Sequence, residues 1–450
     1  MKRVFKSFEV SYDEAYRMNL LEWAGHRFSV SCFLNSNDYL SDRYSSISQV
    51  LALGSANHCL DDGRDAFTLL RSFVDTHNDW LFGFLTYDLK NQIEHLASNN
   101  YDGIKMPGMH FFQPIVVIFP EAGRLTIGCL PGFEDLSDPQ TVFRSVRQHI
   151  KNREFYAGLT DACVHPQNMV PAIRPRVSKE DYLKKVLTIK DHIQKGDIYE
   201  ANYCVEFYAR DADIDPVAVY HRLIDMSPTP FSCLYQLDGR SLICASPERF
   251  LKKQGARLIS QPIKGTIARG KTPYDDEQLK SMLFNDPKER SENIMIVDLV
   301  RNDLSRTAKD GSVFVEELCR IYPFEQVHHM ISTVVSELDP VCHPVEAIRH
   351  AFPMGSMTGA PKVRAMQLIE EVEDTKRGLY SGAVGYFTPE KDFDFNVVIR
   401  SILYNELDKY LGYMAGSAIT AGSDPDKEYE ECLLKAKAMK KALINSIPAQ

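Results

Sequence analysis

Strand-like and helix-like segments come in clusters along this chain, and that clustering is the feature that most constrains its fold. Four short apolar runs separated by turns precede residue 150: "FSVSCFL" (28–34), "WLFGFLTYDL" (80–89), "MHFFQPIVVIF" (109–119) and "RLTIGCL" (124–130). Their length and their β-branched and aromatic content are typical of strands. Strands and helices after residue 178 are again grouped. Because a doubly wound parallel sheet needs strict strand–helix alternation, this order predicts a mixed α+β fold with antiparallel sheets.

The same pattern predicts three regions. Residues 1–150 form a strand-rich N-terminal region, and residues 151–177 carry three prolines without a sustained period, which is typical of a linker. Residues 178–445 begin with a helix signal, because Ser178 is a good N-cap and Asp181 follows three positions later. The residues that then recur at helical spacing and predict the buried face of this helix are Tyr182, Val186, Ile189 and Ile193.

The composition excludes several classes of function. The 450 residues carry a formal net charge of −9 and no basic run, which argues against a nucleic-acid surface. No run of about 18 apolar residues occurs, so no membrane span is expected, and the first residues lack the apolar stretch of a signal peptide. The ten cysteines form no C-x-x-C pair and no zinc spacing, which indicates reduced thiols in a cytoplasmic protein. An acidic chain that binds an anionic substrate needs local positive groups or a metal at its site.

The last predicted helix, over 426–443, carries a stripe of charged residues. Glu428, Glu431 and Lys435 are three and four positions apart, so they share one helical face. Two carboxylates one turn apart can share a divalent cation such as Mg²⁺ through their oxygens, and the lysine can hold an anion beside it. A solvated face with an ordinary Glu–Lys pair explains the same residues. Taken by itself, the helix favours that simpler interpretation.

Four further positions are candidates for chemistry. Glu292 lies at the start of an apolar helix, where the helix dipole alone explains an acid. Glu248 follows a strand in the turn "SPERF", and a buried glutamate with a raised pKa can act as a general acid. Arg400 lies inside the apolar strand predicted over 393–403, so it needs a carboxylate partner from the protein or from a ligand. Lys264 ends a strand before the Gly-Thr turn of "SQPIKGT", where a solvated surface lysine is the ordinary case.

Eight short motifs follow one another in a single order over residues 178–443: "SPERF", "PIKGT", "SENIMIVDLVRND", "VHHMIS", "GSMTGAPKVRAM", "YSGAVGYF", "VIRS" and "EYEECLLKA". This series resembles the chorismate-utilising enzymes, a family that includes anthranilate synthase component I, aminodeoxychorismate synthase component I, and the isochorismate and salicylate synthases. The resemblance implies one large unit in which two antiparallel sheets pack as a sandwich with helices on the outside. The N-terminal strands are expected to join that sandwich.

The resemblance also implies a role for each candidate residue. It implies that Glu292 and Glu431 bind Mg²⁺, that Glu428 reaches the metal directly or through water, and that the metal holds the ring carboxylate of chorismate. Glu248 corresponds to the general acid that protonates the departing C4 hydroxyl. The implied substrate-binding residues are Arg400 on the enolpyruvyl carboxylate, Lys435 and the amides near Gly416 beside the anion, and His329, Ser356, Thr266 and Tyr380 along the pocket.

Lys264 discriminates among the members of this family. By the resemblance, anthranilate synthases have a motif like "PIAGT" at this position, with a small alanine in place of the lysine. Aminodeoxychorismate synthases have a motif like the "PIKGT" of this chain. A lysine that attacks C2 of chorismate expels the C4 hydroxyl through the ring double bonds, and ammonia then attacks C4 and expels the lysine. The lysine must be neutral to attack; burial lowers its pKa and a nearby glutamate raises it, and both remain open at this point. The residue predicts amination of chorismate at C4, on the route to p-aminobenzoate and folate.

The nitrogen source and two alternative functions complete the expectation. Glu200 in "GDIYEANYC" stands at the position where, by the resemblance, isochorismate synthases have a lysine base and aminating members usually have glutamine. A water-activating lysine is therefore excluded here. The role of Glu200 stays open. No nucleophilic Cys–His signature is identified, so ammonia is expected from a separate glutamine amidotransferase subunit. The alternatives are anthranilate synthase component I and a catalytically silent scaffold of an amidotransferase complex. The residues that argue against the scaffold are Glu248, Glu292, Glu431 and Lys264.

Overall fold

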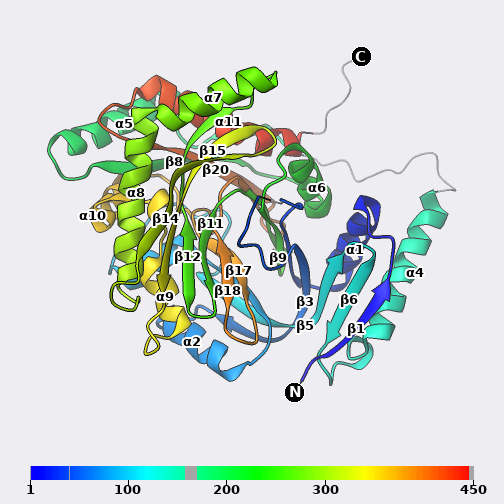
Figure 1. Ribbon diagram of the computed structural model, residues 1–450. Coiled ribbons are helices and arrows are strands. Elements are labelled where there is room, and N and C mark those ends of the chain that lie inside the picture. Colours follow the sequence, from blue (N-terminus) through cyan, green and yellow to red (C-terminus); the bar gives the residue numbers. More distant parts are fainter. Residues whose placement is uncertain (1, 40, 158–169, 445–450) are drawn as a thin grey trace, which may run out of the picture.

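One strand connects all the others into a single branched sheet (Figure 1). The structure is a computed structural model that describes residues 2–39, 41–157 and 170–444. Strand β5 (Met109–Glu121) is long enough to pair with three neighbours, β3 (Gln49–Leu60), β4 (Leu81–Leu85) and β6 (Arg124–Cys129). β5 lies within a first arm of paired strands, and a second arm branches from it through β4. Every pairing between the named strands is antiparallel.

The first arm runs from the N-terminal strands to the C-terminal ones. In order of pairing it contains β1 (Val4–Glu9), β6, β5, β3, β2 (Val30–Asn35), β9 (Phe231–Leu237), β10 (Arg240–Ser246), β19 (Ser401–Asn405), β20 (Tyr410–Ile419) and β8 (Glu200–Ala209). Two short strands, β7 (Arg174–Pro175) and β16 (Gly359–Ala360), pair with β8. The second arm contains β4, β17 (Ala383–Phe387), β18 (Phe393–Asn396), β11 (Arg249–Gln254), β12 (Arg257–Gln261) and β15 (Val327–Glu337), and β15 also pairs with β13 (Ile263–Ala268) and β14 (Phe314–Pro323).

Alternation along the strands sends side chains into two hydrophobic clusters. In β3, Val50 and Ala52 belong to a cluster that also contains Phe395 of the second arm, whereas Leu51 and Leu53 belong to a cluster shared with the helices. Successive strand residues point to opposite faces, so the first arm buries both of its faces. The predicted mixed fold with antiparallel strands is confirmed. The expected division into two separate sheets is not what the pairing gives, because β5 bridges the two arms.

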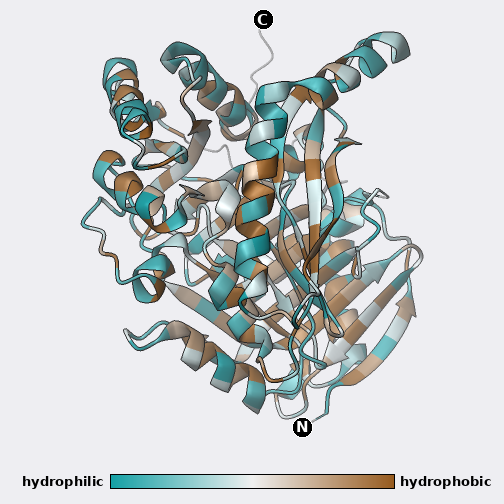
Figure 2. Cartoon of the chain, turned by 60° about the vertical axis from the view of Figure 1, so that its left-hand side comes forward, coloured by the Kyte–Doolittle hydropathy of each residue, from teal (hydrophilic) through white to brown (hydrophobic). Residues whose placement is uncertain are grey.

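Helices cover the outside of both arms (Figure 1). Those packed against the first arm or its end are α1 (Glu14–Arg27), α4 (Pro139–Ala157), α5 (Lys179–Gln194), α6 (Pro216–Met226), α10 (Lys362–Val372) and α11 (Pro425–Leu443). Those beside the second arm and β3 are α2 (Ala66–Thr76), α7 (Pro273–Asn285), α8 (Pro287–Ser305) and α9 (Pro344–Ala351). A short helix, α3 (Lys90–Ile93), follows a turn of 3₁₀ helix. In Figure 2 the apolar colour gathers on the strands and on the helix sides that face them.

The helix predicted after residue 177 shows how local sequence sets an element. Ser178 accepts a hydrogen bond from the backbone N–H of Asp181, which satisfies one of the free amides at the start of α5. Tyr182, Val186 and Ile189 are buried against the first arm, as their spacing predicted. The cap and the apolar stripe together determine where α5 begins and which side it turns inward, and this prediction is confirmed.

Strands from before residue 150 pair with strands from after residue 178. β2 pairs with β9, and β4 pairs with β17, so the two regions share one sheet. The first part of the expected linker is helical, since α4 continues to Ala157. Residues 158–169 of that linker lie outside the described residues, and the boundaries of the three predicted regions stay a prediction.

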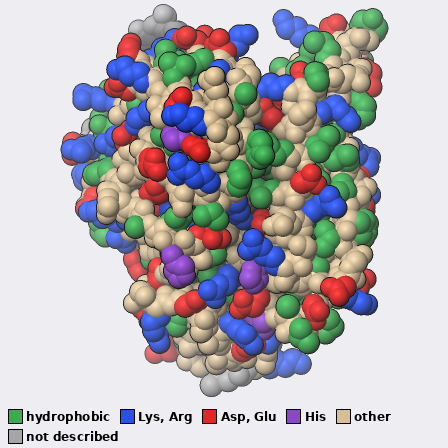
Figure 3. Space-filling view, turned by 90° about the vertical axis from the view of Figure 1, so that its left-hand side faces the viewer, with side chains coloured by type: hydrophobic (Ala, Val, Ile, Leu, Met, Phe, Trp, Pro, Cys, Tyr) green, Lys and Arg blue, Asp and Glu red, His purple; other side chains and the backbone are tan. Residues whose placement is uncertain are grey.

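The described surface is chemically mixed. Figure 3 shows acidic and basic side chains interspersed over one face, with hydrophobic ones scattered between them. Among the described helices, none is both long and apolar enough to cross a membrane. The nine cysteines in the described part of the chain are all free thiols.

Candidate active site

Lys264 is buried inside the protein, whereas a lysine before a Gly-Thr turn is ordinarily a solvated surface residue. It lies in β13, where the pairing with β15 is irregular between Ile263 and Thr266, and Gly265 adopts a φ of 85° there. This bulge re-aims the side chain of Lys264, which is only 8% exposed. Its Nζ lies 2.5 Å from Oε1 of Glu200, the first residue of β8, whose side chain is fully buried. A strand of the second arm and a strand of the first arm thus meet through one ion pair.

The surroundings of Lys264 decide its charge. Burial lowers the pKa of Lys264, but the carboxylates of Glu200, Glu292 and Glu248 together outweigh burial and raise its pKa above the ordinary value. Of the two opposing effects that the sequence left open, the nearby carboxylates therefore outweigh burial. A protonated lysine has to lose a proton before it can attack as a nucleophile.

Glu248 has the environment of a proton donor. It follows β10 in a turn whose backbone is tied down, because Val397 donates its N–H to the carbonyl of Glu248 at 3.0 Å. The side chain is 4% exposed, and Oε1 accepts a hydrogen bond of 2.7 Å from the hydroxyl of Ser356. Burial raises the pKa of Glu248 to about 7, while the Ser356 bond, Lys264 and Arg400 oppose that rise. A carboxyl with this pKa is protonated in much of the protein near neutral pH, which suits a general acid.

A group of acidic residues from two helices surrounds a lysine beside this pair. Nζ of Lys288 in α8 lies 3.8 Å from Oε1 of Glu292 on the same helix and 3.8 Å from Oε1 of Glu428 in α11. Burial raises the pKa of Glu292 to about 7, and the charge of Glu200 adds to the rise while Lys264 opposes it. Burial would also raise the pKa of Glu431, but the ammonium groups of Lys435 and Lys288 outweigh it and hold that pKa below its usual value.

The donor set of this group fits a hard divalent cation. Oε1 of Glu292 is buried and has no hydrogen-bond partner, and Glu292 and Glu428 are 8% and 4% exposed. Carboxylate oxygens are the ligands that Mg²⁺ takes, usually together with water. The oxygens of Glu292, Glu428 and Glu431 are spread more widely than 4.8 Å as a set, and Lys288 lies between two of them. Magnesium at these three residues stays a prediction that the residue types support.

Arg400 does not lie within a strand. The apolar run 393–403 forms β18 and β19, and Arg400 sits between them at a φ of 49°, a conformation that breaks the pairing. Its Nη2 donates to Nε2 of His329 at 3.2 Å, so Nδ1 of that ring carries the proton and donates to the hydroxyl of Thr266 at 2.9 Å. Burial lowers the pKa of Arg400 to about 10. In the described chain, no carboxylate forms an ion pair with Arg400, so its guanidinium keeps free donors for an anion.

His329 stays neutral in this chain of hydrogen bonds. It is 1% exposed, and burial, followed by the charge of Arg400, holds its pKa well below the usual value. A neutral ring can accept from the guanidinium, which a protonated ring cannot. The sequence named Arg400, His329 and Thr266 separately, and the structure joins them.

The two remaining predicted positions differ in their placement. Lys435 donates from Nζ to the carbonyl of Gly416 at 2.9 Å and forms an ion pair with Glu431 at 2.7 Å, so the helix and β20 meet as expected. Tyr380 is 4% exposed, and its hydroxyl is contacted by the thiol of Cys204 at 3.8 Å. Among the described residues, no hydrogen bond joins Tyr380 to the other predicted site residues. Its place along the pocket stays a prediction.

Two residues of the site were not singled out from the sequence. Lys288 precedes Glu292 by four residues, so helical spacing would have placed it beside that acid. Glu289 is on the same helix and lies against the bulge in β13: its Oε2 is 3.1 Å from the position that a Cβ on Gly265 would take. Burial raises the pKa of Glu289. No local signal connects α8 to the bulge in β13, because that proximity is tertiary.

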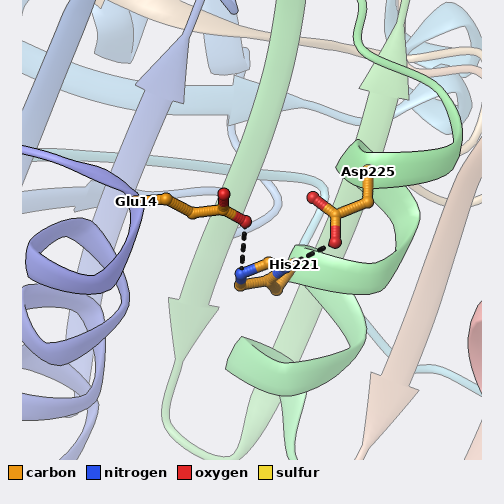
Figure 4. Close-up of side chains that lie close together, drawn as sticks. All are labelled: Glu14, His221 and Asp225. Carbon is orange, nitrogen blue, oxygen red and sulfur yellow. Dashed lines mark hydrogen bonds and ion pairs between the residues drawn. The ribbon is translucent and has the colours of Figure 1, made fainter.

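A separate group of potential metal ligands lies on α1 and α6 (Figure 4). Nε2 of His221 lies 2.8 Å from Oε1 of Glu14, and its Nδ1 lies 2.9 Å from Oδ2 of Asp225. Each ring nitrogen already has a carboxylate partner. We therefore interpret the group as an ion-paired bridge between the two helices and assign no metal to it.

The sequence and the fold both match known proteins. The sequence profile of the chorismate binding enzymes matches residues 32–441. Aminodeoxychorismate synthase component 1 of Bacillus subtilis is 33% identical over 363 residues, which cover 80% of this chain and 76% of that protein. Anthranilate synthase component 1 of Aquifex aeolicus is 31% identical over 440 residues, covering 94% and 87%. The chloroplastic aminodeoxychorismate synthase of Arabidopsis thaliana is 41% identical over 273 residues, covering 60% of this chain.

The match to plant proteins is partial in length. The chain spans 30% of the length of the plant relatives that it matches, from Oryza sativa and Arabidopsis thaliana. Among solved structures, anthranilate synthase component I of Streptococcus pneumoniae has the same fold, with a TM-score of 0.73 and 24% identity over 89% of this chain and 95% of that one. The profile match over most of the sequence and the relatives covered over most of their length lead to one conclusion: this chain belongs to the family of chorismate-binding enzymes.

Proposed function

We propose that this chain aminates chorismate at C4 to give 4-amino-4-deoxychorismate, with Mg²⁺ at its acidic group and a covalent adduct between Lys264 and C2 of the substrate. The observation that carries the proposal is the buried position of Lys264. Its Nζ lies 2.5 Å from Oε1 of Glu200, and its charge interacts with the carboxylates of Glu248 and Glu292. A surface lysine has no such surroundings. The relatives named aminodeoxychorismate synthase support the choice of reaction.

The two catalytic residues act at opposite ends of the ring double bonds. Nζ of Lys264 forms a bond to C2, the π electrons of the ring move toward C4, and the C4–O bond breaks. Glu248 gives its proton to the departing hydroxyl, which leaves as water; its raised pKa keeps that proton available near neutral pH. Ammonia then forms a bond to C4, the electrons return, and the C2–N bond to Lys264 breaks.

Positive groups in an acidic protein hold the dianionic substrate. In this proposal the guanidinium of Arg400, which is hydrogen-bonded to His329, binds the enolpyruvyl carboxylate in a forked geometry. Glu292, Glu428 and Glu431 would hold Mg²⁺, which would supply the positive charge for the ring carboxylate. Lys435 lies beside Glu431 at the same group and adds a second cation.

The ammonia source is proposed to be a glutamine amidotransferase partner. The sequence shows no nucleophilic Cys–His pair of its own, and burial raises the pKa of buried thiols such as Cys204, to about 12, and Cys432, to about 11. Thiols of this kind are poor nucleophiles. Ammonium salts replace the partner in the experiments below.

Mass spectrometry of the intact protein tests the proposal. With Mg²⁺ and chorismate but no ammonia, an adduct is expected on Lys264, and Lys264→Ala is expected to abolish it. Lys253→Ala is the matched control, because Lys253 is also a buried strand lysine but pairs with Asp392. Full ammonia-dependent turnover by Lys264→Ala would refute the covalent route.

Anthranilate synthase component I is the second candidate, because a relative whose match covers 94% of this chain carries that name. That reaction ends in an aromatic product with loss of pyruvate. Fluorescence of anthranilate after adding chorismate, Mg²⁺ and ammonium would favour it. A non-fluorescent aminated product with pyruvate retained supports the proposed reaction.

A further inference from the structure

The charged state of Lys264 creates a problem that the proposed reaction has to solve. The attacking amine must be neutral, yet its carboxylate neighbours keep it protonated. The three carboxylates that raise its pKa are those of Glu200 in β8, Glu292 in α8 and Glu248 in the turn after β10. Glu289 of α8 and Glu431 of α11 also interact with its charge. A carboxylate that already lies beside the buried ammonium is the nearest acceptor for this proton.

Two of the three carboxylates are unsuited to this task. Glu248 already holds a proton for the leaving hydroxyl, and its Oε1 is bonded to Ser356. Glu292 belongs to the acidic group around Lys288, and no hydrogen bond or ion pair joins it to Lys264 in the described chain. Among the described residues, Glu200 is the one hydrogen-bond partner of the Lys264 ammonium.

The backbone around Glu200 holds this carboxylate rigidly. Glu200 pairs with Ala360 of β16, and Tyr199 and Asn202 on either side donate to the carbonyls of Ala360 and Thr358 at 2.7 and 2.8 Å. Gly359 lies so close that a Cβ there would be 2.1 Å from the carbonyl oxygen of Glu200. A side chain on a strand end fixed at three points keeps its geometry during a reaction.

We propose that Glu200 is the proton acceptor for Lys264, and that it holds the lysine proton for the lifetime of the covalent adduct. The proposal rests on the proposed function. The proton moves along the existing hydrogen bond, so that N⁺–H···O⁻ becomes N···H–O without movement of either chain. Oε2 of Glu200 is buried and has no hydrogen-bond partner, so it offers no competing route for the proton.

The protons balance over a full cycle. Lys264 gives one proton to Glu200 and forms its bond to C2, while Glu248 gives one proton to the leaving hydroxyl. Ammonia bonds to C4 and keeps its three hydrogens as the ring electrons return, and Lys264 leaves as a neutral amine. Glu200 then returns its proton to Lys264. The net change is replacement of the C4 hydroxyl by an ammonium group with release of water, at the expense of the proton on Glu248, which solvent restores.

The rate of adduct formation with chorismate and Mg²⁺, measured without ammonia as a function of pH, tests the assignment. In the wild-type protein the proton stays within the Lys264–Glu200 pair, so the rate is expected to be constant below the pH at which Glu248 ionises. Glu200→Gln removes the proton acceptor and also the carboxylate that most raises the pKa of Lys264. The lysine then exchanges its proton with solvent, so the rate is expected to rise with pH through the lowered pKa of Lys264 and to be several-fold lower than wild type near neutrality. Glu200→Asp keeps a carboxylate and is expected to restore part of the rate.

Matched variants separate the possible outcomes. Glu206→Gln changes another buried glutamate of β8, one that pairs with Arg176, and is expected to leave adduct formation unchanged. A Glu200→Gln protein that forms the adduct as fast as wild type at neutral pH would overturn the assignment, and so would a Glu200→Asp protein as slow as Glu200→Gln. Absence of any adduct in the wild-type protein would instead refute the proposed function, independently of Glu200.

Discussion

Removal of one hydroxyl should move the pH at which Glu248 loses its proton. Ser356 donates to Oε1 of Glu248 at 2.7 Å, and this bond favours the ionised carboxylate. Hydrogen bonds to charged groups contribute about 1.5–3 kcal/mol, and part of that remains in the bond to the neutral acid. A net loss of roughly 1.4 kcal/mol corresponds to about one pKa unit. Ser356→Ala is therefore expected to raise the pKa of Glu248 from about 7 by about one unit.

The sign of the effect follows from the role of Glu248. A general acid works in its protonated form, so the rate of adduct formation is high below the pKa of Glu248 and falls as pH rises through it. A raised pKa moves this descending limb to higher pH, and Ser356→Ala should stay active about one pH unit further into the alkaline range. Single-turnover reactions with chorismate and Mg²⁺ are quenched at a series of times and analysed by mass spectrometry. They give the rate of adduct formation at each pH, and therefore the position of the descending limb.

A neighbouring serine provides the control for this experiment. The hydroxyl of Ser246 donates to the carbonyl of Val397 at 2.6 Å and accepts from the backbone N–H of Glu248 at 3.2 Å, so it touches the same residue without touching its carboxylate. Ser246→Ala is expected to leave the descending limb in place. The reasoning would be refuted if Ser356→Ala left the limb unmoved, or if both serine variants moved it equally.

Two further predictions address the frame of the site and its metal. Gly359→Ala places a Cβ 2.1 Å from the carbonyl oxygen of Glu200, so we expect a loss of roughly 1–3 kcal/mol in the free energy of unfolding and a lower urea midpoint. An unchanged midpoint would show that β16 and β8 separate easily. Removal of divalent cations with EDTA is expected to abolish adduct formation, and Mg²⁺ should restore it; Glu292→Gln should weaken Mg²⁺ binding measured by calorimetry. Full activity in EDTA would argue against a metal at this acidic group.

Several elements could be predicted from local sequence alone. The Ser178 cap and the apolar spacing located α5, and the last helix, expected over 426–443, is observed as Pro425–Leu443. These succeed because a cap and a 3.6-residue period act within one or two turns of chain. Arg400 shows where such reasoning fails: its φ of 49° breaks a run whose apolar pattern is that of one continuous strand. The break separates β18, which pairs with β11 in the second arm, from β19, which pairs with β10 in the first, and the pattern of apolar residues does not record this change of arm.

The sequence by itself determined which residue types were available for chemistry: a lysine before a Gly-Thr turn, acids on two helices, and an arginine among apolar residues. It determined the family too, because ordered motifs are a property of sequence. Only the tertiary structure decided that Lys264 is buried among carboxylates that raise its pKa, and that Glu200, 64 positions away, is its partner at 2.5 Å. The physical reason is that a pKa depends on burial and on charges across space. Both are set by how β8, β13 and α8 pack, and no local period or cap encodes that packing.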